Sequence, residues 1–368
     1  MNVKQQTPRP PLLEACRTKK KTMKRTWKSI ALAALMITSA VSMSTSCSVI
    51  DDDLDDCYID LEAEYELRLV TNESFELART LSDRPGIAEA LRSHLSTVFT
   101  DEGRDLDLSF YLDGTRQHRQ TEAMDNAPTK QVGMTLPPED YQHLAVANVQ
   151  GNGTVTLQNS DSYAQVQLSL NAQQEIASQQ TGLFTGRRTF TGMTWGAYAC
   201  HMPLYMANSA AAIVLDPRTA TFTDVKIYTT GFATSFTVAD STYHYDSSPL
   251  VRAERVAMPD TTRWTAFCAV SYPSREPAAL TRAVTHTDQP FDYNDYGEDI
   301  WQYEGYVTLL DGSVTKTTIS IRHPLRAGQL KVIVAYIDDD GRIRLYDQEV
   351  GGSTDLKWEK GYEYPVEI

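Results

Sequence analysis

The sequence predicts an all-β protein made of two tandem antiparallel β-sandwich domains behind a lipoprotein signal peptide. Segments with alternating apolar residues recur from residue 58 onward, and turn residues such as Asp113 and Gly114 separate them. Only one convincing helix interrupts these segments, so strands do not alternate with helices as they do in a parallel α/β protein. At ordinary domain sizes, the 322 residues that follow residue 46 suggest two domains.

Residues 1–46 have the features of a secretory signal peptide region. The basic residues Lys24 and Arg25 precede an apolar run from Ile30 to Val41. This run holds about a dozen residues, whereas a membrane-spanning helix needs about 20, so the segment is too short to remain as an anchor. A basic region normally stands at the very start of a signal, and Met23 is therefore an alternative start of translation.

The end of this region predicts a lipid anchor. Small residues from Ser44 to Ser46 precede Cys47, an arrangement that resembles the bacterial lipobox, in which the cysteine becomes the acylated first residue. Acyl chains such as palmitate would then hold the protein at a membrane, and we expect no other cofactor. Residues 47–57, with the acidic run Asp51 to Asp56, resemble the tethers that direct lipoproteins of the Bacteroidetes to the cell surface. The alternative is a chance cysteine after an ordinary cleavage site.

The charge of the mature chain excludes one class of partner. Residues 1–46 contain nine Lys or Arg and one Glu, and their removal leaves 25 basic and 47 acidic residues, a net charge of −22. Such a charge argues against binding to nucleic acid and against electrostatic adhesion to anionic lipid.

Three cysteines remain once Cys47 carries lipid. In an oxidising compartment the simplest account is one disulfide and one buried thiol. Cys268 lies in the strand-like segment 264–270 and is expected to pack as a small core residue. We favour a disulfide between Cys57 and Cys200, although sequence alone does not fix the pairing.

Residues 58–178 are predicted to form the N-terminal β-sandwich domain. A two-residue alternation over 58–70 predicts the first strand. A helix is predicted over 87–99, because Ile87, Leu91, Leu95 and Val98 recur every three or four positions. Further strands are expected at 106–112, 132–136, 141–148, 155–157 and 166–170.

Residues 179–368 are predicted to form the C-terminal β-sandwich domain. The preceding segment 171–180 is rich in Gln, Ala and Ser, which indicates a linker or a frayed helix. Short strands separated by turn residues then continue to the end of the chain. They are expected at 202–206, 212–215, 225–229, 232–238, 264–270, 301–310, 316–322, 330–338 and 342–346.

Four features occur in a characteristic order along the chain. They are Cys47 with the acidic run to Cys57, the strand and turn over 106–114, the stretch 136–148, and the segment Gly182 to Gly186. Together they resemble the fimbrillin-associated anchor lipoproteins of the Bacteroidales, the FimB-like family. The resemblance implies two transthyretin-like β-sandwich domains behind a lipidated cysteine. Relative to that family, the predicted helix over 87–99 is an insertion.

The same resemblance implies a function. Proteins of this family anchor fimbriae, or pili, in the cell outer membrane, so we expect a surface-exposed lipoprotein at the base of the fimbrium. The expected partner is a fimbrial shaft subunit, a fimbrillin-like protein, and the resemblance leaves open a role in fimbrial assembly or length.

The subunit contact is expected at the C-terminal end or at an edge of the second domain, since a β-sandwich can accept or donate a strand there. The candidate contact residues alternate along the last segment. They are Trp358, Tyr362, Tyr364, Val366 and Ile368. The alternative is that this strand completes the second sandwich.

Catalytic and metal-binding motifs are weak in this sequence, so we predict that the protein is not an enzyme and holds no metal. The seven His residues are scattered, and none has metal-ligand spacing. Cys200, His201 and Met202 are soft metal ligands, but a core strand is the favoured interpretation. The run 292–299 resembles a calcium loop, yet Tyr296 and Tyr303 replace ligands that define an EF-hand.

Glycan binding is the alternative function. Surface aromatics could stack on sugars in a surface lipoprotein of a polysaccharide-uptake system, although alternate aromatic residues of strands more often pack in a core. The aromatic residues in question are Tyr243, Tyr245, Tyr293, Tyr296, Trp301, Tyr303 and Tyr306.

Overall fold

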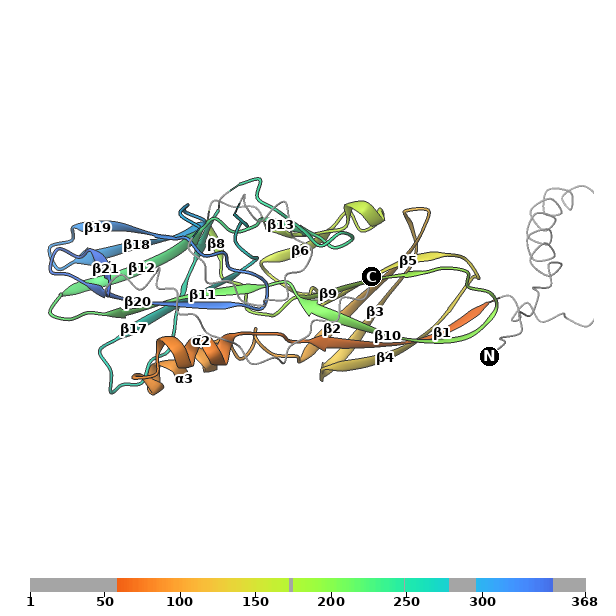
Figure 1. The fold of residues 1–368 in the computed structure, drawn as a ribbon, viewed down its shortest axis with the longest axis horizontal. Coiled ribbons are helices and arrows are strands. Elements are labelled where there is room, and N and C mark those ends of the chain that lie inside the picture. The colour runs from red at the N-terminus through yellow and green to blue at the C-terminus, as the bar shows by residue number, and fades with distance from the viewer. Residues whose placement is uncertain (1–57, 172–174, 248, 278–295, 347–368) are drawn as a thin grey trace, which may run out of the picture. The chain divides into compact units, whose positions relative to one another are not determined.

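The computed structural model describes residues 58–171, 175–247, 249–277 and 296–346 (Figure 1). The signal peptide region, Cys47 with its tether, and the C-terminal candidate residues from Trp358 to Ile368 lie outside the described residues. The predictions that concern these segments stay predictions.

The chain divides into two compact units of unequal size. Within its described residues, the smaller unit holds residues 58–61, Met134–Pro138 and Met193–Tyr198. In it, the hydroxyl of Thr135 donates a hydrogen bond of 3.1 Å to the carboxylate of Asp60. The larger unit holds Glu62–Gly133, Glu139–Gly192 and the chain from Ala199 onward. All sites discussed below lie in this larger unit.

The strands of the described residues form four sheets, which confirms the predicted all-β class. The seven-stranded sheet has the order β3 (Thr115–Ala127), β2 (Gly103–Leu112), β5 (Tyr141–Ala147), β9 (Phe184–Phe190), β10 (Gly196–Met206), β1 (Ile59–Arg68) and β4 (Thr129–Leu136). The four-stranded sheet has the order β14 (Thr242–His244), β13 (Ser235–Thr237), β7 (Gln167–Leu170) and β6 (Val155–Gln158).

The other two sheets have five strands each. One has the order β19 (Val314–Ile321), β18 (Trp301–Leu309), β12 (Phe222–Thr230), β15 (Leu250–Arg252) and β8 (Glu175–Ala177). The other has the order β16 (Glu254–Arg255), β17 (Thr265–Ser271), β11 (Ser209–Asp216), β20 (Leu330–Ile337) and β21 (Ile343–Leu345). Most pairs are antiparallel as expected, but β11 pairs with β20, and β15 with β8, in parallel.

Two hydrophobic cores show which sheets face one another. In the first core, Leu144 and Val146 of β5 meet Leu168 of β7 and Phe236 of β13. In the second core, residues of β11 and β20 meet residues of β12 and β18, as with Ile333 and Trp301. Each core therefore lies between two sheets, the arrangement of a β-sandwich.

Strand pairing joins the chain on both sides of residue 178. Strand β9, which follows this residue, pairs with β5, and β13 pairs with β7, which precedes it. The segment expected to be a linker or frayed helix contains β8, which pairs with β15. The division into domains over 58–178 and 179–368 stays a prediction.

Two α-helices lie between β1 and β2. Helix α3 (Pro85–Leu95) is the predicted one, with Ile87, Leu91 and Leu95 buried on one side. It ends four residues earlier than expected, where Val98 and Phe99 donate hydrogen bonds back to the carbonyl of Leu95. Helix α2 (Glu73–Thr80) was not predicted, because its buried residues are Glu76 and Leu77 and no apolar periodicity marks it. A short 3₁₀ helix at Tyr163–Gln165 lies between β6 and β7.

Most predicted strands are confirmed, and the largest miss is β3. This 13-residue strand is an edge strand with mostly exposed side chains, so it has no apolar alternation to reveal it. Charged and polar residues are common on such edges, where they oppose pairing with other chains.

A buried polar network links three strands of the seven-stranded sheet. The Nε2 atom of His143 lies 2.9 Å from the hydroxyl of Tyr65, and its Nδ1 atom lies 3.0 Å from the carbonyl oxygen of Ser109. Phe110 stacks on the imidazole with 4.0 Å between ring centroids. Burial lowers the pKa of His143 to about 3, so the ring is neutral and its Nδ1–H donates to Ser109. Tyr65 then donates to Nε2.

His143 makes stability depend on pH. In the unfolded chain an ordinary His binds a proton below about pH 6.5, whereas in the folded chain His143 does not until about pH 3. The unfolded state therefore binds more protons in this window, and we predict a loss of about 1.4 kcal/mol of stability per pH unit below pH ~6 from this residue. Urea unfolding of wild type and His143→Phe between pH 7 and pH 4.5 measures the difference in slope.

The control for this prediction is Tyr65→Phe. This variant removes one hydrogen bond and is expected to lose about 1 kcal/mol at every pH, but it keeps the slope because His143 remains. Equal slopes for wild type and His143→Phe would contradict the prediction.

Candidate functional site: the edge of strand β20

Strand β20 has one edge that a neighbouring strand covers only in part. Its partner on that side, β21, pairs in antiparallel register over Ala335 to Ile337, and the backbone N–H of Tyr346 reaches the carbonyl of Val334. No strand pairs with the remaining residues Leu330 to Val332 on this side within the part of the chain that the structure describes. This half of the edge is the candidate functional site.

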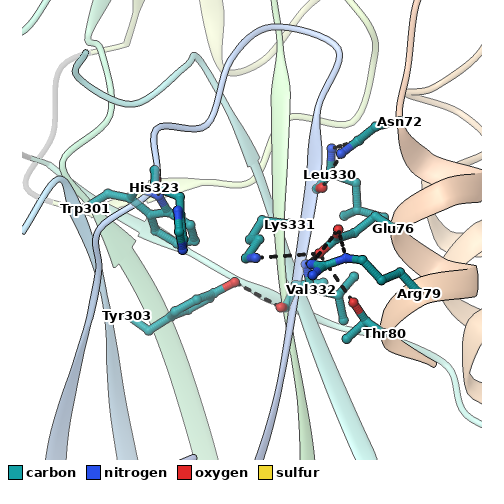
Figure 2. A network of polar contacts seen from close by, with 11 residues as sticks. Asn72, Glu76, Arg79, Thr80, Trp301, Tyr303, His323, Leu330, Lys331 and Val332 are labelled. Atoms are coloured by element: carbon teal, nitrogen blue, oxygen red, sulfur yellow. Dashed lines mark hydrogen bonds and ion pairs between the residues drawn. The ribbon is translucent and has the colours of Figure 1, made fainter. Parts of the chain in front are cut away.

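Asn72 occupies the end of the edge with its side-chain amide. The backbone N–H of Leu330 donates to Oδ1 of Asn72 over 2.6 Å, and Nδ2 of Asn72 donates to the carbonyl of Leu330 over 3.0 Å. Figure 2 shows the amide facing this backbone. An amide group has the same donor and acceptor pair as a peptide unit, so Asn72 takes the place of a residue of a neighbouring strand.

Glu76 occupies the next position along the edge. The backbone N–H of Val332 donates to Oε1 of Glu76 over 3.0 Å. The carboxylate is fully buried and also receives Nη2 of Arg79 at 3.0 Å, while Nζ of Lys331 lies 3.9 Å away (Figure 2). One carboxylate therefore satisfies an edge N–H and carries two cationic neighbours.

The position of α2 explains how these side chains arrive at β20. Asn72 is the N-cap residue of α2, yet its side chain makes no hydrogen bond to the helix and instead binds the strand. Glu76 lies one turn later, so both side chains lie on the same side of the helix. Helix α2 packs on β20, and α3 packs on β17 of the same sheet. A segment between β1 and β2 thus completes a strand 258 positions later.

Burial shapes the electrostatics beside the edge. Desolvation lowers the pKa of Lys331, whose side chain is only 14% exposed, while Glu76 acts in the opposite direction. Tyr303 lies nearby with its hydroxyl donating to the carbonyl of Ala212, and burial raises its pKa well above the ordinary value. The indole N–H of Trp301 donates to the carbonyl of His323. These hydrogen bonds satisfy buried polar groups close to the edge.

Few of the predicted site residues lie in the part of the chain that the structure describes. Cys200 is half-buried and Cys268 is buried, and neither forms a disulfide among the described residues. Burial raises the pKa of the Cys268 thiol to about 12, which fits the expected small core residue. Cys57 lies outside the described residues, so its pairing with Cys200 stays a prediction.

The aromatic residues considered for glycan binding do not form one surface platform. Trp301 and Tyr303 are each only 1% exposed. The hydroxyl of Tyr243 donates to the carbonyl of Ala207, and that of Tyr245 to the carbonyl of Ser274. Tyr293 lies outside the described residues. Trp301 and Tyr303 therefore pack in the core as alternate residues of a strand, and they are not exposed for sugar stacking.

A separate open groove lies beside β5 and the 3₁₀ helix. It has a volume of about 470 Å³ and includes Tyr163, whose ring meets that of Tyr111 edge to face at 5.5 Å. Asp140 and Gln142 add polar groups to its lining. An aromatic ring beside polar side chains is a surface on which a sugar could stack.

Other chemistry is sparse where the structure can be described. No cluster of three or more His, Cys, Asp or Glu there is arranged to hold a metal ion. Among the same residues, no helix is long and apolar enough to cross a membrane. Of the predicted calcium-like run, residues 292–295 lie outside this part of the chain.

Comparison with known proteins gives structural similarities only. No family model matches the sequence, and no curated protein sequence matches it. Among solved structures, a candidate adhesin from Bacteroides ovatus is 11% identical, with a TM-score of 0.48 over 84% of this chain and 99% of that chain. The fimbrial anchor protein Mfa2 from Porphyromonas gingivalis is 11% identical, with a TM-score of 0.45 over 79% of this chain and 100% of that chain.

A third similar structure is the tip fimbrial protein Mfa3 from Porphyromonas gingivalis with C-terminal truncation. It is 10% identical, with a TM-score of 0.41 over 78% of this chain and 98% of that chain. At this level of identity and superposition, similarity does not extend to function.

Asn72 and Glu76 are the site residues that the sequence did not reveal. An Asn before an acidic first turn is an ordinary helix start, and it signals a cap rather than a contact with a distant strand. A Glu in a short polar helix is expected in solvent. The only signal available was the N-cap pattern, which would have located α2 but not its partner.

We predict that Glu76→Gln destabilises the fold by about 3 kcal/mol. The amide keeps the shape but removes the charge, so Lys331 loses the carboxylate that offsets its burial. Urea unfolding at pH 7 measures the effect. The matched control is Glu89→Gln in α3, where a carboxylate that is 70% exposed pairs with Arg92. It is expected to change stability by at most about 0.5 kcal/mol, and equal losses in both variants would contradict the account.

Proposed function

We propose that this protein is an outer-membrane lipoprotein that anchors fimbriae at the cell surface and holds their basal subunit. Lipid on Cys47 attaches it to the membrane, and the acidic segment 51–56 separates the folded part from the lipid. The C-terminal segment, which follows β21, contacts a fimbrillin-like subunit through strand pairing. The role is that of a mechanical link and involves no catalysis.

One observation carries this proposal. Among the described residues, β21 is the edge strand of its sheet, and the described chain ends just after it at Tyr346. The residues that follow, 347–368, include the alternating apolar positions from Tyr362 to Ile368. A segment with this alternation that follows an edge strand is suited to pair with a strand of another chain.

The N-terminal end supports the same proposal. The lipobox-like residues 44–47 come before an acidic tether, and the resemblance to anchor lipoproteins rests on these residues and on the order of three later segments. Two or more acyl chains hold a protein stably at a membrane, whereas one chain holds it only marginally. Lipid at one end and a strand-pairing segment at the other give the chain the two attachments that an anchor needs.

Glycan binding is the second candidate function. The groove that contains Tyr163 is the observation that favours it, because an aromatic ring and polar side chains meet there. Its residues differ from the aromatic set expected from the sequence.

We predict that the membrane attachment of the fimbrial subunit depends on Cys47. Tagged wild-type protein and Cys47→Ala are purified from native cell envelopes and from the soluble fraction, and co-purifying chains are identified by mass spectrometry. Wild type should stay in the outer membrane with a fimbrillin-like subunit. Cys47→Ala should fold normally and leave the membrane together with that subunit, because the substitution removes only the lipid.

Three outcomes would contradict parts of the proposal. Membrane fractionation of Cys47→Ala would contradict the lipid anchor. Recovery of no fimbrillin-like subunit with either protein would contradict the anchor function. Recovery of an outer-membrane transporter or of glycan in its place would favour the second candidate.

A further inference from the structure

Strand β21 and helix α2 cover successive parts of the same edge of β20. In the antiparallel register, Leu345 lies opposite Ala335 and Tyr346 opposite Val334. The backbone groups of Leu330, Val332 and Val334 all point to this edge, as their hydrogen bonds to Asn72, Glu76 and Tyr346 show. Alternate residues of a strand point the same way, so each of these three positions is a pairing position for a neighbouring strand.

The chain that leaves Tyr346 continues with Asp347, Gln348, Glu349 and Val350. If the same register is extended by four residues, Gln348 falls opposite Val332 and Val350 opposite Leu330. At such a pair, each residue donates its N–H to the carbonyl of the other. The carboxylate of Glu76 thus stands where the carbonyl of Gln348 would be, and the amide of Asn72 stands where the peptide groups of Val350 would be.

We infer that residues 347–350 and helix α2 compete for the same edge of β20. When α2 is docked, Asn72 and Glu76 satisfy the backbone groups of Leu330 and Val332 at the edge. When residues 347–350 extend β21, they take over the same backbone groups and α2 is released. The edge is a docking site for a segment of this same chain, and α2 is its removable cover.

The consequence for the anchor rests on the proposed function. Residues 347–350 connect β21 to the alternating segment that is proposed to hold the subunit. If subunit binding makes residues 347–350 pair with β20, helix α2 is displaced from the edge. Binding at the C-terminal end would then change the position of a helix that lies between β1 and β2 in sequence. The competition itself requires no subunit and can be tested on the isolated protein.

Amide hydrogen exchange with single-residue resolution on the purified full-length mature chain tests the competition. Asn72→Ala combined with Glu76→Gln weakens the cover, and Gln348→Pro added to this pair removes the N–H that the competing strand needs. We expect the amide of Val332 to stay protected in the double variant, because residues 347–350 replace α2. Adding Gln348→Pro should lower that protection by at least about tenfold. Gln348→Thr is the matched control and should leave it unchanged.

Equal exchange of Val332 with and without Gln348→Pro would overturn the inference. A second measurement covers the case in which the double variant does not fold. In an otherwise wild-type chain, Gln348→Pro removes the competitor, so the amide of Leu81, which donates to Leu77 at the end of α2, should exchange several-fold more slowly. An unchanged rate there would also overturn the inference. Neither result depends on the fimbrial subunit, so failure here leaves the envelope experiment to judge the proposed function.

Discussion

The buried edge of β20 is the constraint on which the second sandwich depends. Backbone N–H groups that are removed from water must find partners, and an unpaired one costs about 1–3 kcal/mol. At Leu330 and Val332 the partners are side chains from α2, while β21 pairs with β20 over Ala335 to Ile337. The two helices between β1 and β2 are thereby fixed on the sheet of β17 and β20.

This arrangement buries the carboxylate of an ion pair. The carboxylate of Glu76 has no exposure, and Arg79 and Lys331 are beside it. Such a cluster adds little net stability compared with an apolar one, but breaking it by removing one member is costly. It therefore specifies where α2 docks more than it strengthens the fold. In the seven-stranded sheet a neutral buried imidazole links three strands, because His143 joins Tyr65 to the carbonyl of Ser109.

Alternation and turn residues predicted the all-β class and most strands, because half-buried strands such as β1 and β20 carry apolar residues at every second or near-second position. The four-residue spacing of Ile87, Leu91 and Leu95 likewise predicted α3. Strand β3 was not predicted because an edge strand needs no apolar face. Helix α2 was not predicted because its buried side contains Glu76. The partner of Asn72 is 258 residues away, and no local pattern specifies a contact of that range. Pairing of β9 with β5 and of β13 with β7 was also not predictable, since strand order depends on tertiary packing.

The two ends of the chain have different proposed tasks. The proposed lipid lies at the N-terminal end, and the described chain ends at Tyr346, next to the edge of β20 where side chains of α2 take the place of a neighbouring strand. The sequence that follows has apolar residues at alternate positions from Tyr362 to Ile368, a pattern that is suited to strand pairing. The central claim is that this C-terminal segment, and no other exposed aromatic surface, meets the fimbrial subunit.

Photo-crosslinking in native envelopes tests that claim most directly. A benzoylphenylalanine replaces Trp358 in the alternating segment, or Trp195, an indole that is 59% exposed elsewhere on the protein, as the matched position. The account predicts a crosslink from position 358 to a fimbrillin-like subunit and none from position 195. A subunit crosslink from position 195 with none from position 358 would contradict it.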